Sequence, residues 1–281
     1  MLLTGANGFI GGHLKKHIKC ITVDYTGCDF NGDLSDINFV NSLPEVDTII
    51  HLAAFNSTKN FYSTPFKVIN SIISPTMNLL QRYNNAHFVF ASSSETYAGG
   101  IDNNFVTIPT PEEVVLSIND ITNPRWSYAS GKIAMESAII SSGIEHNRPW
   151  TILRLHNVYG ANQKNHFIPE FVERLKKGKA ELYGWKNTRA FCFIDDAIEL
   201  IKTAINYKNE IINIGSNNEV RIIDIAHIIM DILNYDKSTL KCYDGPKGST
   251  ARRVPDITKI LSYTKNFKFT SLQNGLEKII K

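Results

Sequence analysis

The sequence has no apolar run long enough to cross a membrane and no marked excess of either charge. A membrane-spanning helix needs about 20 consecutive apolar residues. The chain enters a strand-like apolar segment at Met1-Leu2-Leu3, which leaves no room for a signal peptide. Its 30 basic and 27 acidic residues give a net charge of +3, and the basic residues are dispersed, so nucleic acid is not an expected partner. We therefore expect a cytoplasmic protein that binds neither nucleic acid nor membranes.

Cysteine is also scarce. The four cysteines, at positions 20, 28, 192 and 242, show no paired spacing, and two of them lie in runs typical of strands. Disulfides are therefore not expected, and buried free thiols in a reducing compartment are.

Motifs of metal and hydrolase chemistry are missing as well. His13 and His17 lie one helical turn apart, but no third ligand follows at a suitable spacing, so no metal site is predicted. The sequence has no HExxH, Walker or Gly-x-Ser-x-Gly motif, which argues against metalloprotease, P-loop and serine-hydrolase activities.

The first motif that points to a function is a glycine-rich segment that begins at residue 4. Three glycines, Gly5, Gly8 and Gly11, follow a short apolar run and precede an amphipathic one. This pattern predicts a strand, a tight turn and a helix, whose free N–H groups face a pyrophosphate. The residues expected to contact a dinucleotide here are Gly5, Asn7, Gly8, Phe9, Ile10 and Gly11.

An acidic residue follows at the spacing that a dinucleotide site requires. Asp24 ends the next apolar run, nineteen residues after Gly5. A carboxylate at this point accepts hydrogen bonds from the adenosine ribose and repels a 2′-phosphate. The predicted cofactor is therefore NAD and not NADP. After a short polar connection come Asp33 and Leu34, also predicted to bind the cofactor, and Ser35, the expected cap of a helix.

The next part of the chain alternates apolar strand-like runs with helical patterns. Continuous apolar runs of this kind are typical of parallel strands covered on both faces. We predict an α/β fold with a Rossmann-type, doubly wound parallel sheet. Leu52, Ala53 and Ala54 end one strand, where small residues let the cofactor approach closely. The predicted segments are strands over 46–52, 87–91 and 150–155, and helices from 65 to about 84 and from about 127.

Beyond residue 160 the predicted elements become shorter. We predict an NAD-binding domain over 1–160, with its sheet completed by elements around 190–215, and a smaller mixed α/β substrate lobe over 161–281 that is interleaved with it. The elements expected in this part are helices over 168–177, 195–207 and 222–233 and strands near 181–183, 191–194 and 211–214.

Tyr128 and Lys132 form a candidate acid/base pair, because a spacing of four residues places both on one face of a helix. A phenol with a pKa of about 10 is a poor base at neutral pH, but an adjacent ammonium and a bound nicotinium charge both favour the phenolate. A serine at the end of the preceding strand, Ser93, is placed to hold a substrate hydroxyl while Tyr128 takes its proton.

Taken together, these motifs resemble the extended short-chain dehydrogenase/reductase family of nucleotide-sugar epimerases and dehydratases. The resemblance spans nearly the whole chain, and several motifs in the correct order are more specific than any one of them. The matching segments are Gly5-x-x-Gly8-x-x-Gly11, His51-Leu52-Ala53-Ala54, Ser92-Ser93-Ser94, Tyr128-x-x-x-Lys132, Arg154-x-x-Asn157-x-Tyr159-Gly160 and Arg252 to Lys259.

The resemblance implies roles for particular residues. Tyr128 takes the position of the catalytic base, Ser93 orients the substrate, and Lys132 binds the nicotinamide ribose. Arginine suits a diphosphate because its planar fork engages two oxygens, and Arg252 or Arg253 is expected to supply one of these contacts, with Arg253 assigned here. The substrate-binding residues that the resemblance implies are Ser93, Ser94, Asn157, His166, Arg189 and Arg253.

The role of Glu95 decides between epimerisation and reactions that eliminate water or carbon dioxide. In relatives that eliminate water or decarboxylate, a glutamate follows the catalytic hydroxyl by two residues, as Glu95 follows Ser93. It is therefore counted among the catalytic residues, as the group that removes the C5 proton, although it could equally hold the local structure.

The expected activity is hydride transfer from sugar C4 to NAD and back, through a 4-keto intermediate. Epimerisation is the leading outcome and 4,6-dehydration the second. A one-way reductase of 4-keto-6-deoxysugars is an alternative, and a catalytically silent nucleotide-sensing regulator is the non-enzymatic one. The expected partner is a nucleotide-diphosphate sugar, and the resemblance implies a homodimer.

Overall fold

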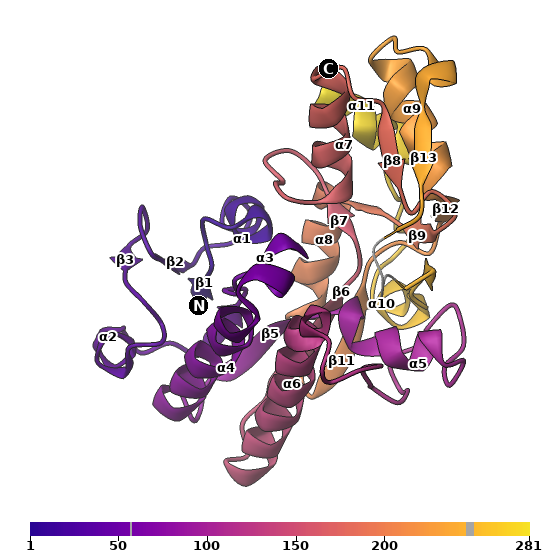
Figure 1. Ribbon diagram of the computed structural model, residues 1–281. Helices are drawn as coiled ribbons and strands as arrows, with labels where there is room; N and C mark the ends of the chain where they lie inside the picture. Colours follow the sequence, from indigo (N-terminus) through magenta and orange to yellow (C-terminus); the bar gives the residue numbers. More distant parts are fainter. Residues whose placement is uncertain (57, 246–249) are drawn as a thin grey trace.

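A computed structural model describes residues 1–56, 58–245 and 250–281, and a seven-stranded sheet lies at its centre (Figure 1). The strand order is β11-β6-β5-β4-β1-β2-β3, and every neighbouring pair is parallel. The chain winds outward in both directions from β1, which is the arrangement of a doubly wound fold. The predicted Rossmann-type sheet is confirmed. Its strands are β1 (Leu2–Thr4), β2 (Ile21–Asp24), β3 (Phe30–Asn31), β4 (Thr48–His51), β5 (His87–Ser93), β6 (Trp150–Leu155) and β11 (Glu210–Ile214).

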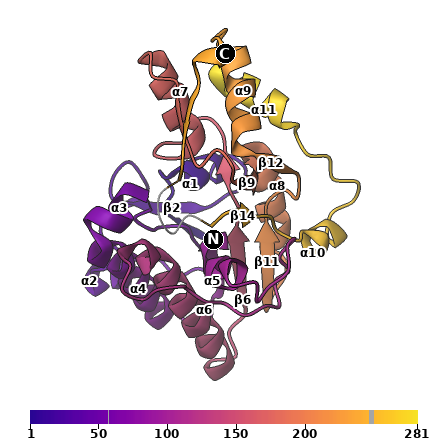
Figure 2. The same cartoon turned by 45° about the vertical axis from the view of Figure 1, so that its right-hand side comes forward.

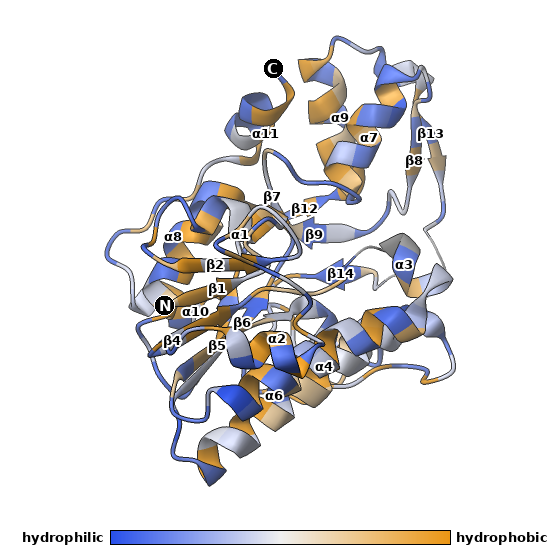
Figure 3. Ribbon diagram, turned by 90° about the vertical axis from the view of Figure 1, so that its left-hand side faces the viewer, coloured by the Kyte–Doolittle hydropathy of each residue, from blue (hydrophilic) through white to orange (hydrophobic). Residues whose placement is uncertain are grey.

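Helices cover both faces of this sheet, and a separate apolar core lies under each set (Figure 3). Successive strand residues point to opposite faces: Leu3 packs in one core and Leu2 in the other. The Leu3 core is covered by α1 (Phe9–Leu14) and α8 (Ile194–Ala204). The Leu2 core is covered by α2 (Ile37–Ser42), α4 (Pro65–Arg82) and α6 (Ser127–Glu145). The inner strands β1, β4, β5 and β6 are thus buried on both sides, as the apolar runs predicted, whereas the edge strand β3 is not.

Smaller sheets and three longer helices form a second part of the molecule, and its helices α7, α9 and α11 are drawn above the main sheet in Figure 2. The strand orders are β12-β9-β14, β13-β8 and β10-β7. Because α8 and β11 return to the main sheet between these elements, the two parts are interleaved in sequence; the division at residue 160 stays a prediction. The elements are β7 (Val158–Tyr159), α7 (Phe167–Lys176), β8 (Glu181–Tyr183), β9 (Thr188–Ala190), β10 (Cys192–Phe193), β12 (Glu219–Arg221), α9 (Ile222–Ile232), β13 (Lys241–Tyr243), β14 (Arg252–Arg253) and α11 (Leu272–Ile280).

The structure differs from the sequence predictions in short elements. The polar connection after Asp24 contains the edge strand β3, which pairs with β2 over two residues and is too short to show a period of two in the sequence. The cap of α2 is Asp36, whose side chain accepts from the Asn38 amide, and not Ser35. The short elements not yet named are α3 (Thr58–Ser63), α5 (Ala98–Asp102), α10 (Thr258–Ser262) and the 3₁₀ turns Ser94–Tyr97, Pro124–Trp126 and Lys237–Thr239.

The cysteines are free, as predicted. Cys192 is buried, Cys20 and Cys28 are partly buried and Cys242 is exposed, so burial of the strand thiols holds fully for Cys192 only. Among the described residues, no helix combines the length and the apolar character that spanning a membrane requires.

A buried arginine closes the carboxyl end of α4. Arg148 follows α6 and is 2% exposed, and its Nη1 donates to the carbonyls of Leu80 at 3.3 Å and Tyr83 at 3.2 Å. Its guanidinium also lies 5.5 Å from the ring centroid of Phe88. The last carbonyls of a helix lack partners within the helix, so this side chain satisfies groups that would otherwise be buried without a hydrogen bond.

Replacing Arg148 is therefore expected to destabilise the fold without touching the cleft described below. Arg148→Ala removes both hydrogen bonds and leaves a cavity, and should lower the free energy of unfolding by about 2 kcal/mol. The control is Arg221→Ala, because Arg221 pairs with Asp224 at the exposed surface, where a pair contributes less than about 1 kcal/mol. Urea unfolding measures both variants, and equal losses would contradict the capping role.

Candidate active site

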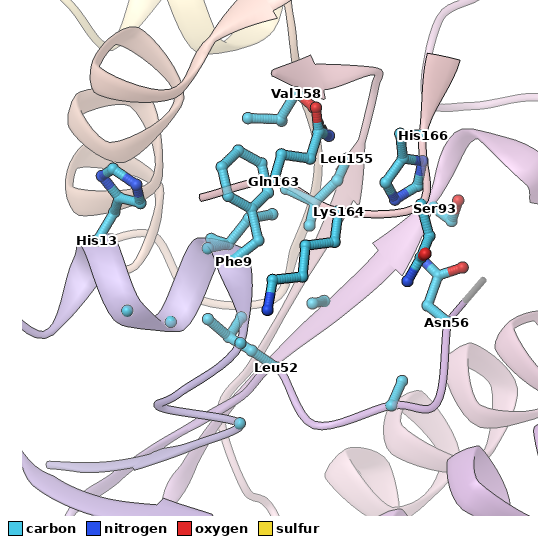
Figure 4. A pocket seen from close by; sticks show the side chains of 18 of the residues that line it. Phe9, His13, Leu52, Asn56, Ser93, Leu155, Val158, Gln163, Lys164 and His166 are labelled. Atoms are coloured by element: carbon cyan, nitrogen blue, oxygen red, sulfur yellow. Dashed lines mark hydrogen bonds between the residues drawn. The ribbon is translucent and has the colours of Figure 1, made fainter. Parts of the chain in front are cut away.

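A cleft of about 740 Å³ opens at the carboxyl ends of β1, β4 and β5 (Figure 4). In open α/β sheets this edge, next to the point where the strand order reverses, is where ligands bind. Most of the predicted site residues line it: Gly5, Asn7, Gly8, Phe9, Ile10, Gly11, Leu52, Ala54, Ser93, Ser94, Glu95, Tyr128, Lys132, Asn157, His166 and Arg253. The predicted residues outside this lining are Asp24, Asp33, Leu34, Ala53 and Arg189.

The glycine loop has a backbone that other residues would not allow. Gly5 has a φ of +68°, and a Cβ there would lie 2.7 Å from the amide nitrogen of Ala53. A Cβ on Gly11 would lie 2.1 Å from the carbonyl oxygen of Gly5. Strand, turn and helix therefore approach as closely as a dinucleotide cradle demands, and the amides at the start of α1 face the cleft. The residues present fit the pyrophosphate of NAD.

Asp24 lies beside this loop, at the end of β2. Its carboxylate accepts hydrogen bonds from the amides of Asn7 and Tyr25, both at 2.8 Å. These bonds hold the carboxylate at the loop, and its oxygens retain lone pairs for ribose hydroxyls. Asp33 is exposed and accepts from the amide of Ser35 at 2.9 Å. Their roles as cofactor contacts stay predictions.

The end of β5 and the start of α6 bring three predicted residues together. The Ser93 hydroxyl lies close enough to Tyr128 to lower the pKa of its phenol, and both side chains line the cleft. The ammonium of Lys132, one turn after Tyr128, donates to the carbonyl of Ala91 at 2.6 Å. Tyr128 is 6% exposed and Lys132 2%, and the ring of Phe61 stacks on Tyr128 with centroids 5.3 Å apart. Ser93, Tyr128 and Lys132 therefore lie together at the wall of the cleft.

Burial dominates the protonation of this pair. It raises the pKa of Tyr128, the charge of Glu95 adds to the rise, and the nearby Ser93 hydroxyl opposes it. Burial also lowers the pKa of Lys132 to about 7. The ammonium lies 5.6 Å from the centroid of the Tyr128 ring. In the protein alone the Tyr128 pKa therefore moves upward, opposite to the direction expected from the Lys132 charge.

Glu95 is held by two arginines. It accepts from Arg125 Nη2 at 3.0 and 3.1 Å and from Arg253 Nη1 at 2.8 Å. Burial alone would raise the pKa of this carboxyl, but the charges of Arg253 and Arg125 outweigh it and lower the pKa to about 2. Two positive charges against one negative leave a net positive charge beside Tyr128. Among the described residues, Nε of Arg253 has no partner.

Arg125 is a member of this cluster that the sequence did not reveal. It precedes Tyr128 by three residues in a 3₁₀ turn and belongs to no motif, so only the fold shows that it faces Glu95. Lys164 was also missed. It lies in the loop before α7 and lines the cleft, where Figure 4 shows its side chain extending toward Leu52 and Phe9.

The other predicted arginines have different surroundings. Arg189 donates to the carbonyls of Thr188, Thr250 and Ala251, so in the protein alone its guanidinium binds backbone. Arg252 pairs with Glu219. Of the two neighbouring arginines it is therefore Arg253 that faces the cleft.

Asn157 and His166 also line the cleft. Asn157 has a φ of +31°, and its side-chain amide donates to the carbonyl of Ala190 at 3.1 Å. His166 immediately precedes α7, and Figure 4 shows it on the Ser93 side of the cleft together with Asn56. Their contacts with a substrate stay predictions.

Known proteins resemble the chain over nearly its whole length. A family model described as NAD dependent epimerase/dehydratase family matches residues 1–215. The chain is 29% identical to UDP-N-acetyl-alpha-D-glucosaminuronate decarboxylase from Bacillus cytotoxicus, covering 100% of this chain and 96% of that protein. It is 26% identical to a putative UDP-glucose 4-epimerase from Methanocaldococcus jannaschii, covering 100% and 97%. The structure of UDP-glucose 4-epimerase from Thermotoga maritima has the same fold, with a TM-score of 0.83 at 24% identity over 99% of this chain and 96% of that one.

Alanine substitutions at two adjacent glycines of α1 test the close packing of the glycine loop. Gly11→Ala forces a Cβ against the Gly5 carbonyl and should weaken NAD binding at least about tenfold, because the turn must open. Gly12→Ala is the matched control, since the nearest atom to its Cβ is 3.9 Å away, and its affinity should stay near that of the wild type. NADH fluorescence titration measures both, and equal affinities would contradict the close-packed cradle.

Proposed function

The chain belongs to the NAD-dependent epimerase/dehydratase family, and on that premise we propose that it oxidises C4 of a nucleotide-diphosphate sugar, holds the 4-keto intermediate and reduces it again. Epimerisation at C4 is the proposed outcome. The convergence of Ser93, Tyr128 and Lys132 beside the glycine loop supports this proposal most directly.

The glycine loop and two charged residues are the proposed cofactor contacts. The amides at the start of α1 bind the pyrophosphate, Asp24 accepts from the adenosine ribose and Lys132 donates to the nicotinamide ribose. NAD, when bound, supplies the hydride acceptor.

The proton of the sugar hydroxyl goes to the protein. Ser93 orients the C4 hydroxyl, and Tyr128 takes its proton as the hydride leaves C4. Because burial raises the pKa of Tyr128 in the protein alone, the positive charges of Lys132 and of the bound cofactor must favour the phenolate. In the return step Tyr128 gives a proton back to O4, so no net proton is consumed.

The sugar nucleotide is proposed to lie between the Ser93 side of the cleft and the α7 loop. Arg253, Asn157 and His166 are the proposed contacts of the diphosphate and sugar, with Ser94 beside Ser93. Arg189 would join them only after releasing backbone carbonyls.

The surroundings of Glu95 favour epimerisation over dehydration. Removal of the C5 proton requires a base, and a carboxylate with a pKa of about 2, bound by two arginines, is a weak one. Glu95 is better suited to hold Arg125 and Arg253 in place than to accept a proton.

Decarboxylation of an acidic sugar is a second candidate. The net positive charge of the Glu95, Arg125 and Arg253 cluster favours a substrate carboxylate beside the reacting carbon. Oxidation at C4 of a uronate makes a β-keto acid, whose C5–carboxyl bond breaks without a base at C5. The 29% identical relative is named as a decarboxylase, which agrees with this alternative.

One NMR experiment separates these reactions. Proton spectra are recorded in deuterated water with UDP-, GDP-, dTDP- and CDP-sugars, including UDP-glucuronate, while NADH absorbance is followed. Inversion at C4 without exchange is the expected result. Loss of the carboxyl group identifies the decarboxylase, and deuterium at C5 with loss of water identifies a dehydratase. Stoichiometric NADH consumption with a 4-keto sugar identifies a reductase. Binding without conversion of any sugar would contradict an enzymatic role and favour the regulator.

The base assignment has its own test. Tyr128→Phe removes the proton acceptor and should lower kcat by about 10²- to 10⁴-fold with the substrate so identified. The control is Tyr263→Phe, a tyrosine that stacks on Tyr207 and does not line the cleft. Full turnover by Tyr128→Phe would show that another group takes the proton. The homodimer and the cytoplasmic location stay predictions.

A further inference from the structure

Three consecutive residues of β5 meet three side chains on one face of α6, and two of these contacts are hydrogen bonds. The helix residues follow one another at intervals of four, so they share a face. One contact uses a backbone carbonyl and two use serine hydroxyls. The pairs are Ala91 with Lys132, Ser92 with Glu136, and Ser93 with Tyr128. Glu136 is the member of this set for which the proposed reaction has no use.

Glu136 joins α6 to two strands at once. It accepts from Ser92 of β5 and from Arg154 of β6, whose Nε lies at 3.1 and 3.2 Å and whose Nη2 lies at 2.6 Å. Both partners of this ion pair are 2% exposed, and Ser92 and Arg154 are opposite each other in the sheet. Nη1 of Arg154 donates to the Tyr97 hydroxyl and the Glu112 carbonyl, both at 2.8 Å. The pair therefore fixes the helix relative to both strands.

A contribution to stability does not by itself account for the buried ion pair between Glu136 and Arg154. Removing two charges from water costs several kcal/mol per ion, and apolar residues of similar volume often replace a buried pair without loss. An apolar pair would provide neither the hydrogen bond with Ser92 nor a negative charge one helical turn from Lys132.

The other groups around Lys132 do not supply that charge. On α6 it faces Tyr128 and Glu136. From β4 it faces His51, whose pKa is lowered to about 3 by burial and by the Lys132 charge, so this imidazole is neutral at physiological pH. From β5 it meets the Ala91 carbonyl and the Phe90 ring, at 4.4 Å from the centroid. Burial lowers the pKa of Lys132 to about 7, and Glu136 opposes that fall.

We propose that Glu136 is a positioning residue for the reaction: it holds the Tyr128 and Lys132 face of α6 against the end of β5, and its charge keeps Lys132 protonated. Glu136 does not line the cleft, so it acts through Lys132 and Ser92. The mechanistic part of this inference rests on the proposed function, and the charge effect is measurable without any sugar nucleotide.

The charge effect is tested by lysine NMR. In protein with ¹³C-labelled lysine, the Lys132 signal is identified by its absence in Lys132→Met, and its titration midpoint should be near 7 in the wild type. Glu136→Gln keeps the shape and one of the two acceptor oxygens but removes the charge, so the midpoint should fall by about 1 pH unit. NADH affinity, which declines as Lys132 loses its proton, should decline at a correspondingly lower pH.

Two further variants separate charge from position. Glu136→Asp keeps the charge but shortens the reach, so the Lys132 midpoint should stay in place while kcat falls at least about tenfold. Ser137→Ala, at the next and exposed residue of α6, should change neither. If Glu136→Gln does not fold, Glu136→Asp still tests the positional part.

An unchanged Lys132 midpoint in Glu136→Gln would overturn the charge effect, and full kcat in Glu136→Asp would overturn the positioning role. If no sugar nucleotide is converted by the wild type, the proposed function fails, whereas the NMR titration and NADH binding still decide whether Glu136 controls Lys132.

Discussion

The contact between α6 and the carboxyl end of β5 is the constraint on which the candidate active site depends. Tyr128 and Lys132 reach the cleft from α6, and Ser93 reaches it from β5. The relative positions of these three side chains therefore depend on how α6 packs against β5. Apolar packing alone is non-directional. The hydrogen bonds that join Ala91 to Lys132 and Ser92 to Glu136 add the direction that apolar contacts lack.

Charge is distributed around this contact in two layers. The inner layer, Glu136 with Arg154, is neutral as a pair and hidden from the cleft. The outer layer, Glu95 with Arg125 and Arg253, keeps a positive charge at the cleft wall. Two carboxylates, Glu95 and Glu136, thus lie near Tyr128 and Lys132, each bound by arginine. The positive charge at the cleft wall favours anionic ligands, whereas the charge of Glu95 raises the pKa of Tyr128.

The sequence predicted the parts that local rules govern. The glycine loop, the parallel strands, and the spacing of Tyr128 and Lys132 follow from backbone sterics and periodicity, which act over a few residues. The two-residue strand β3 and the cap Asp36 were missed, because such elements have no periodicity to detect. Arg125 was missed for a different reason: its partner Glu95 is thirty residues away, and only the folded chain brings the two together.

The pairing of Glu95 with Arg253 joins residues 158 positions apart, and this separation bears on how the protein is made. Chains fold during synthesis largely from the N-terminus. The sheet up to β6 and the helix with Tyr128 and Lys132 emerge from the ribosome long before β14. During that interval Glu95 can pair with Arg125 but not with Arg253, and the cleft lacks the positive charge that Arg253 supplies. A chain cut before β14 would keep all seven strands of the main sheet, Tyr128 and Lys132 but would lack Arg253. The last segment to be synthesised therefore completes a cleft whose lining begins at the fifth residue.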